Sequence, residues 1–258
     1  MELRRMRDVY VKTESDVHLN LNYDALEANF GAYDQTCWYE DGMFNRNFRD
    51  FSQNASFEDA YWDAVKNATT FGNDPHIRWR ARTFQFFLSH ALPGTCLELG
   101  TSHGFMFFFA LTYMRSKGFD FGDSRILLID KFSQSAVDSK SGQPIETNTQ
   151  LYANSYEEVR IRFNEFEFVE VIEGWVPKVL STLLIEEIRF LHLDLNAAQT
   201  EVAALQFLMP KLSKGATVLL DDYGFPELHE SQSAHYALSQ QIGYDILSLP
   251  TGQGLIIF

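Results

Sequence analysis

The chain has 258 residues, 45% of them hydrophobic, which is enough for a full core in one domain with additions or in two small domains. Lysine and arginine number 21 against 35 acidic residues, a net charge of −14, and this balance argues against nucleic acid or an anionic membrane as a partner. Residues 1–10 lack the apolar core of a secretory signal, no run reaches transmembrane length and only two cysteines occur, so we expect a reduced, cytoplasmic protein.

Residues 1–75 are rich in Asn, Asp and aromatic side chains and show little periodicity, apart from a short helix expected over 57–70. We interpret this stretch as a helical or irregular appendage to a domain that covers residues 76–258. Such a segment either folds over an active site as a lid or packs against the outside of a sheet. Its aromatic surface also makes it a candidate interface for a homo-oligomer.

Helix and strand signals alternate from residue 76 onward. Strands are predicted at 95–99, 126–129, 168–172, 188–193 and 217–220, and helices at 76–90, 105–114, 152–163, 179–185, 201–212 and 231–242. Helical crossovers join parallel neighbours, whereas the last two strands, 244–249 and 255–258, have a connection too short for a crossover and must be antiparallel. The sequence therefore predicts an α/β fold, a Rossmann-like, doubly wound, mostly parallel seven-stranded sheet with an antiparallel C-terminal hairpin.

A tight loop follows the first of these strands and runs from Gly100 to Gly104. Glycines in such a loop let the backbone approach a ligand closely. A middle glycine of the dinucleotide fingerprint is missing, so the loop by itself is a weak signal. Asp130 closes the second strand, at the position where folds of this kind place the acid that binds ribose hydroxyls.

Three aspartates end two of the strands. Asp194 follows strand 188–193, and Asp221 and Asp222 follow strand 217–220. Because the strands are expected to be parallel, the three carboxylates should meet at the edge where ligands of open sheets bind. Carboxylates so placed repel one another unless a cation neutralises them, and oxygen ligands without Cys or His favour magnesium, manganese or calcium. The alternative for each aspartate is that it caps a helix or a turn.

Taken in this order, the residues resemble the class I S-adenosylmethionine-dependent methyltransferases. Residues 97–104 resemble the first motif of that class, Asp130 resembles its ribose-binding acid, and the likeness runs from about residue 75 to the end. The resemblance implies S-adenosylmethionine as cofactor. Its expected contacts are Glu98, Gly100, Thr101, Ser102, Gly104, Asp130, Gly174 and Trp175.

Residues 173–177, 194–210 and 221–224 resemble more narrowly the macrocin O-methyltransferase family, which binds magnesium and methylates sugar hydroxyls of natural products. This resemblance implies a small-molecule hydroxyl acceptor, a sugar moiety of a natural product or of a polysaccharide precursor. It also implies Mg²⁺ or Mn²⁺ held by three carboxylates, those of Asp194, Asp221 and Asp222.

Position 196 departs from that family. Its members often have an aspartate there, proposed as the general base, whereas this chain has Asn196, whose amide cannot take a proton at neutral pH. Asn196 stays in the predicted catalytic site, and His229 and His235 are the alternative candidates for the base. For either histidine alone, the competing interpretation is a place on the surface.

Two other functions stay open. One is an oxidoreductase with a nicotinamide cofactor, against which the incomplete glycine loop and the terminal hairpin argue. The other is a non-catalytic relative that keeps the fold as a binding or assembly module, and Asn196 is the feature that favours it.

Overall fold

The structure is a computed structural model of the chain. It describes residues 50–51, 54–68, 74–132, 136–137, 144–145, 156–225 and 228–258, together with the backbone of two short strands, β1 (Trp38–Glu40) and β2 (Met43–Asn45). Most of the predicted appendage, residues 1–75, lies outside these residues. The chain divides into two compact units, and the elements described next belong to the larger one, which contains residues 49–258.

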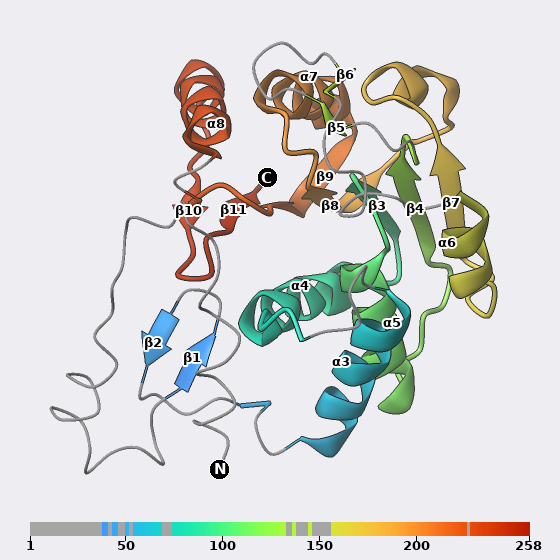
Figure 1. Cartoon of the computed structure of the whole chain (residues 1–258). Coiled ribbons are helices and arrows are strands. Elements are labelled where there is room, and N and C mark those ends of the chain that lie inside the picture. The colour runs from blue at the N-terminus through green and yellow to red at the C-terminus, as the bar shows by residue number, and fades with distance from the viewer. Residues whose placement is uncertain are drawn as a thin grey trace, which may run out of the picture. The chain divides into compact units, whose positions relative to one another are not determined.

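A seven-stranded sheet with the order β10-β11-β9-β8-β3-β4-β7 forms the centre of this unit (Figure 1). Its strands are β3 (Thr95–Leu99), β4 (Arg125–Asp130), β7 (Val169–Glu173), β8 (Ile188–Leu193), β9 (Leu212–Leu220), β10 (Leu247–Ser248) and β11 (Gly254–Ile257). The strands from β9 to β7 are parallel to their neighbours, whereas β11 runs antiparallel to both β9 and β10. The predicted fold class is confirmed, including the C-terminal hairpin. A further pair, β5 (Ala136–Val137) and β6 (Pro144–Ile145), is antiparallel.

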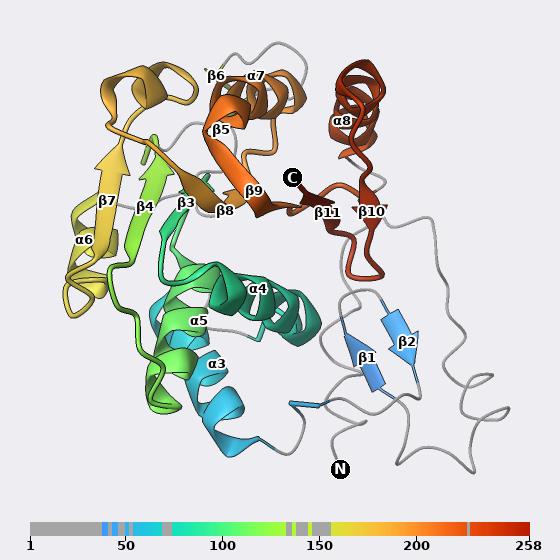
Figure 2. The ribbon, with the colours of Figure 1, turned by 180° about the vertical axis from the view of Figure 1, so that it is seen from behind.

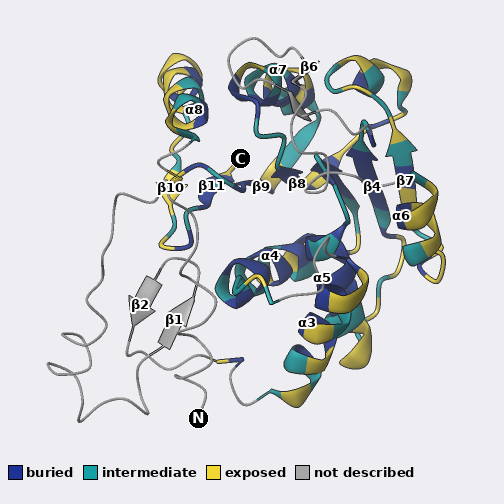
Figure 3. Cartoon of the chain, in the orientation of Figure 1, coloured by how far each residue is buried: buried dark blue, intermediate teal, exposed yellow. Residues whose placement is uncertain are grey.

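Helices cover both faces of the sheet, as Figures 1 and 2 show. One face carries α3 (Ala55–Asn67), α4 (Arg78–Ala91), α5 (Phe105–Ser116) and α6 (Tyr156–Arg162), and the other carries α7 (Ala198–Leu208) and α8 (His229–Ile242). The core under the first face is rich in phenylalanine, and the core under the second is mostly leucine, isoleucine and valine. Buried residues concentrate on the strands and on the helix sides that face them (Figure 3). Among the helices that the structure describes, none is long and apolar enough to cross a membrane.

Several element boundaries differ from the predictions for local reasons. Helix α3 begins at Ala55 because the side chain of Asn54 caps it by accepting a hydrogen bond from the N–H of Phe57. Helix α7 ends at Leu208, and a 3₁₀ turn over Met209–Lys211 leads directly into β9, because Pro210 cannot continue an α-helix. The α-helix predicted at 179–185 is wrong. The structure has a 3₁₀ helix over Lys178–Thr182 instead, and β8 begins soon after it, at Ile188.

Candidate active site

The glycine loop packs against the end of the strand that carries the first predicted metal ligand. Gly100 has a φ of +94°, and a Cβ at this position would lie 1.8 Å from the backbone oxygen of Asp194. Its N–H donates to the carbonyl of Ile129, 2.8 Å away. A glycine is therefore required because the chain meets itself here, in addition to any ligand that approaches. The loop after β3 is therefore in direct backbone contact with Asp194, the residue that follows β8.

The eight residues predicted to contact the cofactor all lie at the carboxyl ends of β3, β4 and β7. Asp130 holds the loop in place, since its carboxylate accepts hydrogen bonds from the N–H groups of Ser102 at 2.7 Å and Phe132 at 2.9 Å. Trp175, which follows β7, has a half-exposed ring with the ammonium of Lys131 5.0 Å from its centre.

Two buried polar atoms at the end of β3 fit a ligand that carries hydrogen-bonding groups. Glu98 Oε2 and Thr101 Oγ1 make no hydrogen bond of standard geometry within the described parts of the chain, although the Thr101 side chain partly offsets the burial that raises the pKa of Glu98. Buried polar atoms are rarely left without a partner, because an unmade hydrogen bond in the interior is costly. The carboxyl edge of β3 therefore suits a ligand with polar groups.

The three predicted metal ligands come together at the ends of β8 and β9. Carboxylate oxygens of Asp194, Asp221 and Asp222 lie within 4.8 Å of one another. Parallel pairing of the two strands, with the N–H of Asp221 donating to the carbonyl of Leu193 at 2.9 Å, fixes this arrangement. The side chain of Asp221 is only 7% exposed, whereas that of Asp222 is 21% exposed.

Asp221 is surrounded by donors that the sequence analysis missed. Its Oδ2 accepts a hydrogen bond from Nη1 of Arg80 at 2.6 Å. Its Oδ1 lies 3.0 Å from the amide Nε2 of Gln253 and 3.2 Å from Nε2 of His192. Arg80 Nη1 also lies 3.4 Å from Oδ1 of Asp222, so one guanidinium contacts two of the three carboxylates.

His192 connects the acidic cluster to the cofactor side of the site. It is fully buried in β8, with Nδ1 3.0 Å from Oε1 of Glu98 and Nε2 facing Asp221. Burial opposes its charge, but the hydrogen bonds to Asp221 and Glu98 outweigh burial and raise the pKa of His192 to about 10. Burial also raises the pKa of Glu98. With a carboxylate oxygen at hydrogen-bonding distance from each ring nitrogen, we assign His192 as an imidazolium that donates to both sides.

The three aspartates differ in their affinity for a proton. Burial acts against ionisation of Asp221, yet Arg80 and His192 outweigh it and hold the pKa of this carboxyl well below its usual value. Burial and the negative charge of Asp221 raise the pKa of Asp222 to about 6. Burial, followed by repulsion from Asp221 and Asp222, raises the pKa of Asp194 well above its usual value.

A magnesium ion does not fit this cluster with Arg80 in its place, although three carboxylates are the right kind of donor. Mg²⁺ requires six oxygens at about 2.0–2.1 Å in near-octahedral geometry. Both carboxylate oxygens of Asp221 already accept hydrogen bonds, and Nη1 of Arg80 lies 2.6 Å from Oδ2 of Asp221 and 3.4 Å from Oδ1 of Asp222. An ion there would meet a fixed positive charge.

The residues predicted to act as the base are placed differently from one another. Asn196 has a φ of +53°, and its Nδ2 lies 3.5 Å from Oδ1 of Asp194. His229 is exposed at the first position of α8, as its competing interpretation expected. For His235 the expected surface position is wrong, because the side chain is 1% exposed and its Nε2 lies 3.1 Å from Oε2 of Glu201.

Glu201 holds the chain next to Asp194 in place. Its Oε1 accepts the N–H of Leu195 at 3.2 Å, and its Oε2 accepts the hydroxyl of Ser231 besides facing His235. Burial opposes ionisation of Glu201, but the hydrogen bonds from His235 and Ser231 prevail and lower the pKa of the carboxyl. The structure thus places His235 in a buried network between α7 and α8.

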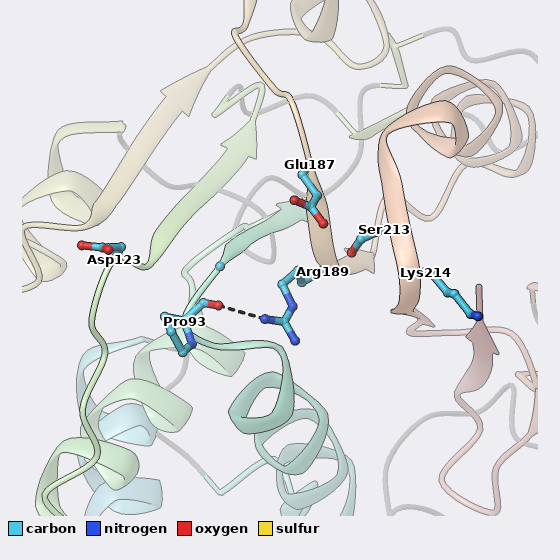
Figure 4. Close-up of a pocket in the computed structure, with 7 residues that line it drawn as sticks. Pro93, Asp123, Glu187, Arg189, Ser213 and Lys214 are labelled. Carbon is cyan, nitrogen blue, oxygen red and sulfur yellow. Dashed lines mark hydrogen bonds between the residues drawn. The ribbon is translucent and has the colours of Figure 1, made fainter.

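A shallow hollow of about 410 Å³ lies at the opposite edge of the sheet (Figure 4). It is lined by Pro93, Gly94, Asp123, Glu187, Arg189, Ser213 and Lys214. These residues stand at or before the amino ends of β3, β4, β8 and β9, and Arg189 donates to the carbonyl of Pro93 at 3.2 Å. The hollow therefore shares no residue with the acidic cluster or the glycine loop.

Comparison with known proteins agrees with this geometry. Residues 97–223 match the family described as a methyltransferase domain. Demethyldecarbamoylnovobiocin O-methyltransferase of Streptomyces niveus is 25% identical over 199 residues, 72% of this chain and 74% of that protein. A tetracenomycin-C 4'-O-methyltransferase of Streptomyces olivaceus, whose substrate carries a dimethoxy-rhamnosyl group, is 24% identical over 148 residues, 53% of this chain and 55% of that protein. The alignment thus spans about half of the second relative.

A solved structure shows the same fold. The methyltransferase PaMTH1 of Podospora anserina, bound to the demethylated cofactor SAH, has a TM-score of 0.55 at 14% identity and covers 93% of this chain and 97% of its own. The sheet order, with β11 antiparallel between β9 and β10, and the glycine loop at the carboxyl edge define a class I S-adenosylmethionine-dependent methyltransferase. Within that class, the chain is an O-methyltransferase.

Proposed function

We propose that this O-methyltransferase transfers the methyl group of S-adenosylmethionine to a hydroxyl of a small molecule that binds at the acidic edge. The observation that carries the proposal is the contact between Gly100 and the backbone of Asp194, because it puts the cofactor loop and the carboxylates side by side. An acceptor held by these carboxylates lies next to a cofactor held by the loop. Bringing the two reactants together supplies much of the rate, since methyl transfer needs no covalent enzyme intermediate.

The carboxylates differ in exposure, which favours different roles for them. Asp221, nearly buried and held by three donors, orders the site, whereas Asp222 is open enough to meet an acceptor. In this proposal the acceptor hydroxyl donates to Asp222 or Asp194, and one of these carboxylates takes its proton while the oxygen gains the methyl group. Asn196, beside Asp194, orients the acceptor, and exposed His229 is the remaining histidine candidate for the base.

A sugar is the acceptor that we propose. The name of one relative places its substrate hydroxyl on a molecule with a rhamnosyl group, and sugars present neighbouring hydroxyls that pair well with carboxylates. The magnesium or manganese predicted from the sequence is not part of this proposal, because Arg80 lies against two of the three carboxylates. The assignment of residues 76–258 as the methyltransferase domain with an N-terminal appendage is likewise part of the proposal.

Two measurements test the proposed function. S-adenosylmethionine titrated calorimetrically into the chain should bind with micromolar affinity, and Asp130→Ala should weaken it at least about tenfold because the glycine loop loses its anchor. Sugar glycosides and nucleotide-linked deoxysugars are then tested for S-adenosylhomocysteine release. Turnover with a member of this panel supports the proposal. Cofactor binding without turnover on sugars or other hydroxyl compounds would favour the non-catalytic alternative.

A further inference from the structure

We propose that Arg80 is the resident cation of the acidic edge and that methyl transfer by this chain requires no divalent ion. The inference rests on the proposed function and concerns how the same site balances its charge. It reverses the expectation of a metal. An arginine reaches the carboxylates from the neighbouring helix and contacts two of the three that the ion would need.

Arg80 is built into the interior and is held from several sides. It belongs to the third position of α4, is 9% exposed, and its Nη1 contacts Asp221 and Asp222. Its Nη2 lies 3.5 Å from the carbonyl of Thr251, and its guanidinium carbon lies 4.7 Å from the ring centre of Phe225. A surface arginine that pairs by chance would be free to change rotamer, whereas four contacts fix this one.

The turn between β10 and β11 completes the same arrangement. Gln253 is fully buried, and its Oε1 accepts a hydrogen bond from the hydroxyl of Thr251 at 3.0 Å. This contact orients the amide so that Nε2 donates to Asp221. One short turn therefore supplies a donor to the carboxylate and, through the carbonyl of Thr251, an acceptor to Arg80. The turn therefore stabilises both partners of the ion pair between Arg80 and Asp221.

Arginine and a divalent ion compete for the same carboxylates here. An ion on the remaining lone pair of Asp221 Oδ2, at about 2.1 Å, would lie within a few ångströms of Nη1 of Arg80, which is 2.6 Å from the same oxygen, and the two positive charges would repel each other in the interior. Moving the ion to Oδ1 does not help, because Gln253 and His192 both point at that atom. The guanidinium meanwhile leaves part of Asp222 exposed for an acceptor hydroxyl. The site thus contains both a positive charge, that of Arg80, and a partly exposed carboxylate, that of Asp222.

Manganese binding tests this inference without an acceptor. Mn²⁺ prefers the same oxygen ligands as Mg²⁺ and can be followed by the loss of the free-ion signal in electron paramagnetic resonance. Wild-type protein, Arg80→Met and Arg82→Met are titrated after removal of metals by a chelator. Arg82 lies on the same helix and pairs with Asp50 instead, so its variant is the matched control.

We expect no saturable Mn²⁺ binding to wild type or Arg82→Met below about 1 mM, and binding at least about tenfold tighter to Arg80→Met, lost again when Asp222→Asn is added. Saturable binding to wild type that Asp221→Asn removes would overturn the inference. Equal binding by wild type and Arg80→Met would also overturn it. The wild-type titration decides even if a variant does not fold.

A second measurement separates this inference from the proposed function. S-adenosylmethionine is titrated into wild type in excess chelator and again with Mg²⁺, and the turnover of any accepted sugar is compared in the same two buffers. Unchanged affinity and turnover support Arg80 as the cation. Turnover that falls more than about tenfold in chelator and returns with Mg²⁺ refutes the inference but leaves the proposed function intact. Failure to bind the cofactor in either buffer refutes the proposed function.

Discussion

Replacing His192 should show how much stability the buried charges contribute. The imidazolium lies between Glu98 at 3.0 Å and Asp221 at 3.2 Å, and it packs edge-on against Phe84. His192→Phe therefore keeps an aromatic ring and removes the charge together with both hydrogen bonds. Removing one partner of a buried ion pair typically costs about 3–5 kcal/mol, because the other charge stays buried without compensation. Asp221 keeps Arg80 and Gln253, so the loss falls mainly on Glu98.

Urea denaturation at pH 7 measures the effect. A loss of this size should move the midpoint down by roughly 1–2.5 M, given slopes of about 2–3 kcal/mol per molar urea. Adding Glu98→Met to His192→Phe removes the stranded acid and should restore at least about half of the loss. The control His90→Phe, at an exposed site on α4, should stay within about 0.5 kcal/mol of wild type. A single variant His192→Phe that unfolds within about 1 kcal/mol of wild type would refute the charge balance described here.

The sign of the pH dependence follows from the same residue. Because the pKa of His192 is raised from 6.5 to about 10, its contribution to stability is complete below about pH 6.5 and is lost as the pH rises toward 10. The slope from this one group is at most about 1.4 kcal/mol per pH unit. A nitrogen-15 NMR titration of histidine-labelled protein checks it, with the His192 signal assigned by its absence from His192→Phe. A His192 imidazole that titrates near pH 6.5 would contradict the prediction.

Three further predictions follow from neighbouring contacts. Gly100→Ala should destabilise the fold by more than about 2 kcal/mol and weaken cofactor binding, whereas Gly118→Ala, also at positive φ but in open space, should cost about 1 kcal/mol in thermal unfolding. The pKa of Glu201 is lowered, so its stabilisation is present above about pH 4.5 and is lost on acidification. Glu201→Gln should therefore flatten the acid side of the stability curve below about pH 4.5. Asp130→Asn should weaken S-adenosylmethionine binding less than Asp130→Ala in the same calorimeter, because an amide oxygen can still accept one loop N–H.

The fold and the acidic edge were predictable because both follow from local rules. Alternating strand and helix signals imply parallel neighbours, and parallel neighbours bring the ends of their strands to one edge. Asp194, Asp221 and Asp222 met there as expected. The helix ends were less certain because one proline or one capping asparagine moves a boundary by several residues.

The partners of Asp221 could not be predicted from spacing. Arg80 is 141 positions away in sequence, and only the packing of α4 beside β9 brings it to the carboxylate. The sequence shows a basic stretch at 78–82 but not which arginine points inward. His192 left a clearer signal, since its place in a strand of otherwise apolar core residues marks a buried polar group that needs a partner. The apolar surroundings of a histidine would have distinguished buried His235 from exposed His229 only if the buried face of α8 had been known.

The edge hairpin that carries Gln253 has a consequence for how the enzyme loses activity. Strand β10 has two residues and β11 four, so this hairpin is the part of the sheet with the fewest ladder bonds. If it detaches, the acidic edge loses the amide of Gln253 and the carbonyl of Thr251 that steadies Arg80, while the five parallel strands still hold. Inactivation on warming should therefore precede the loss of secondary structure, and among the strands of the seven-stranded sheet hydrogen exchange should be fastest in β10 and β11. The stability of the β10–β11 edge hairpin, and not that of the central strands, would set the upper temperature limit of activity.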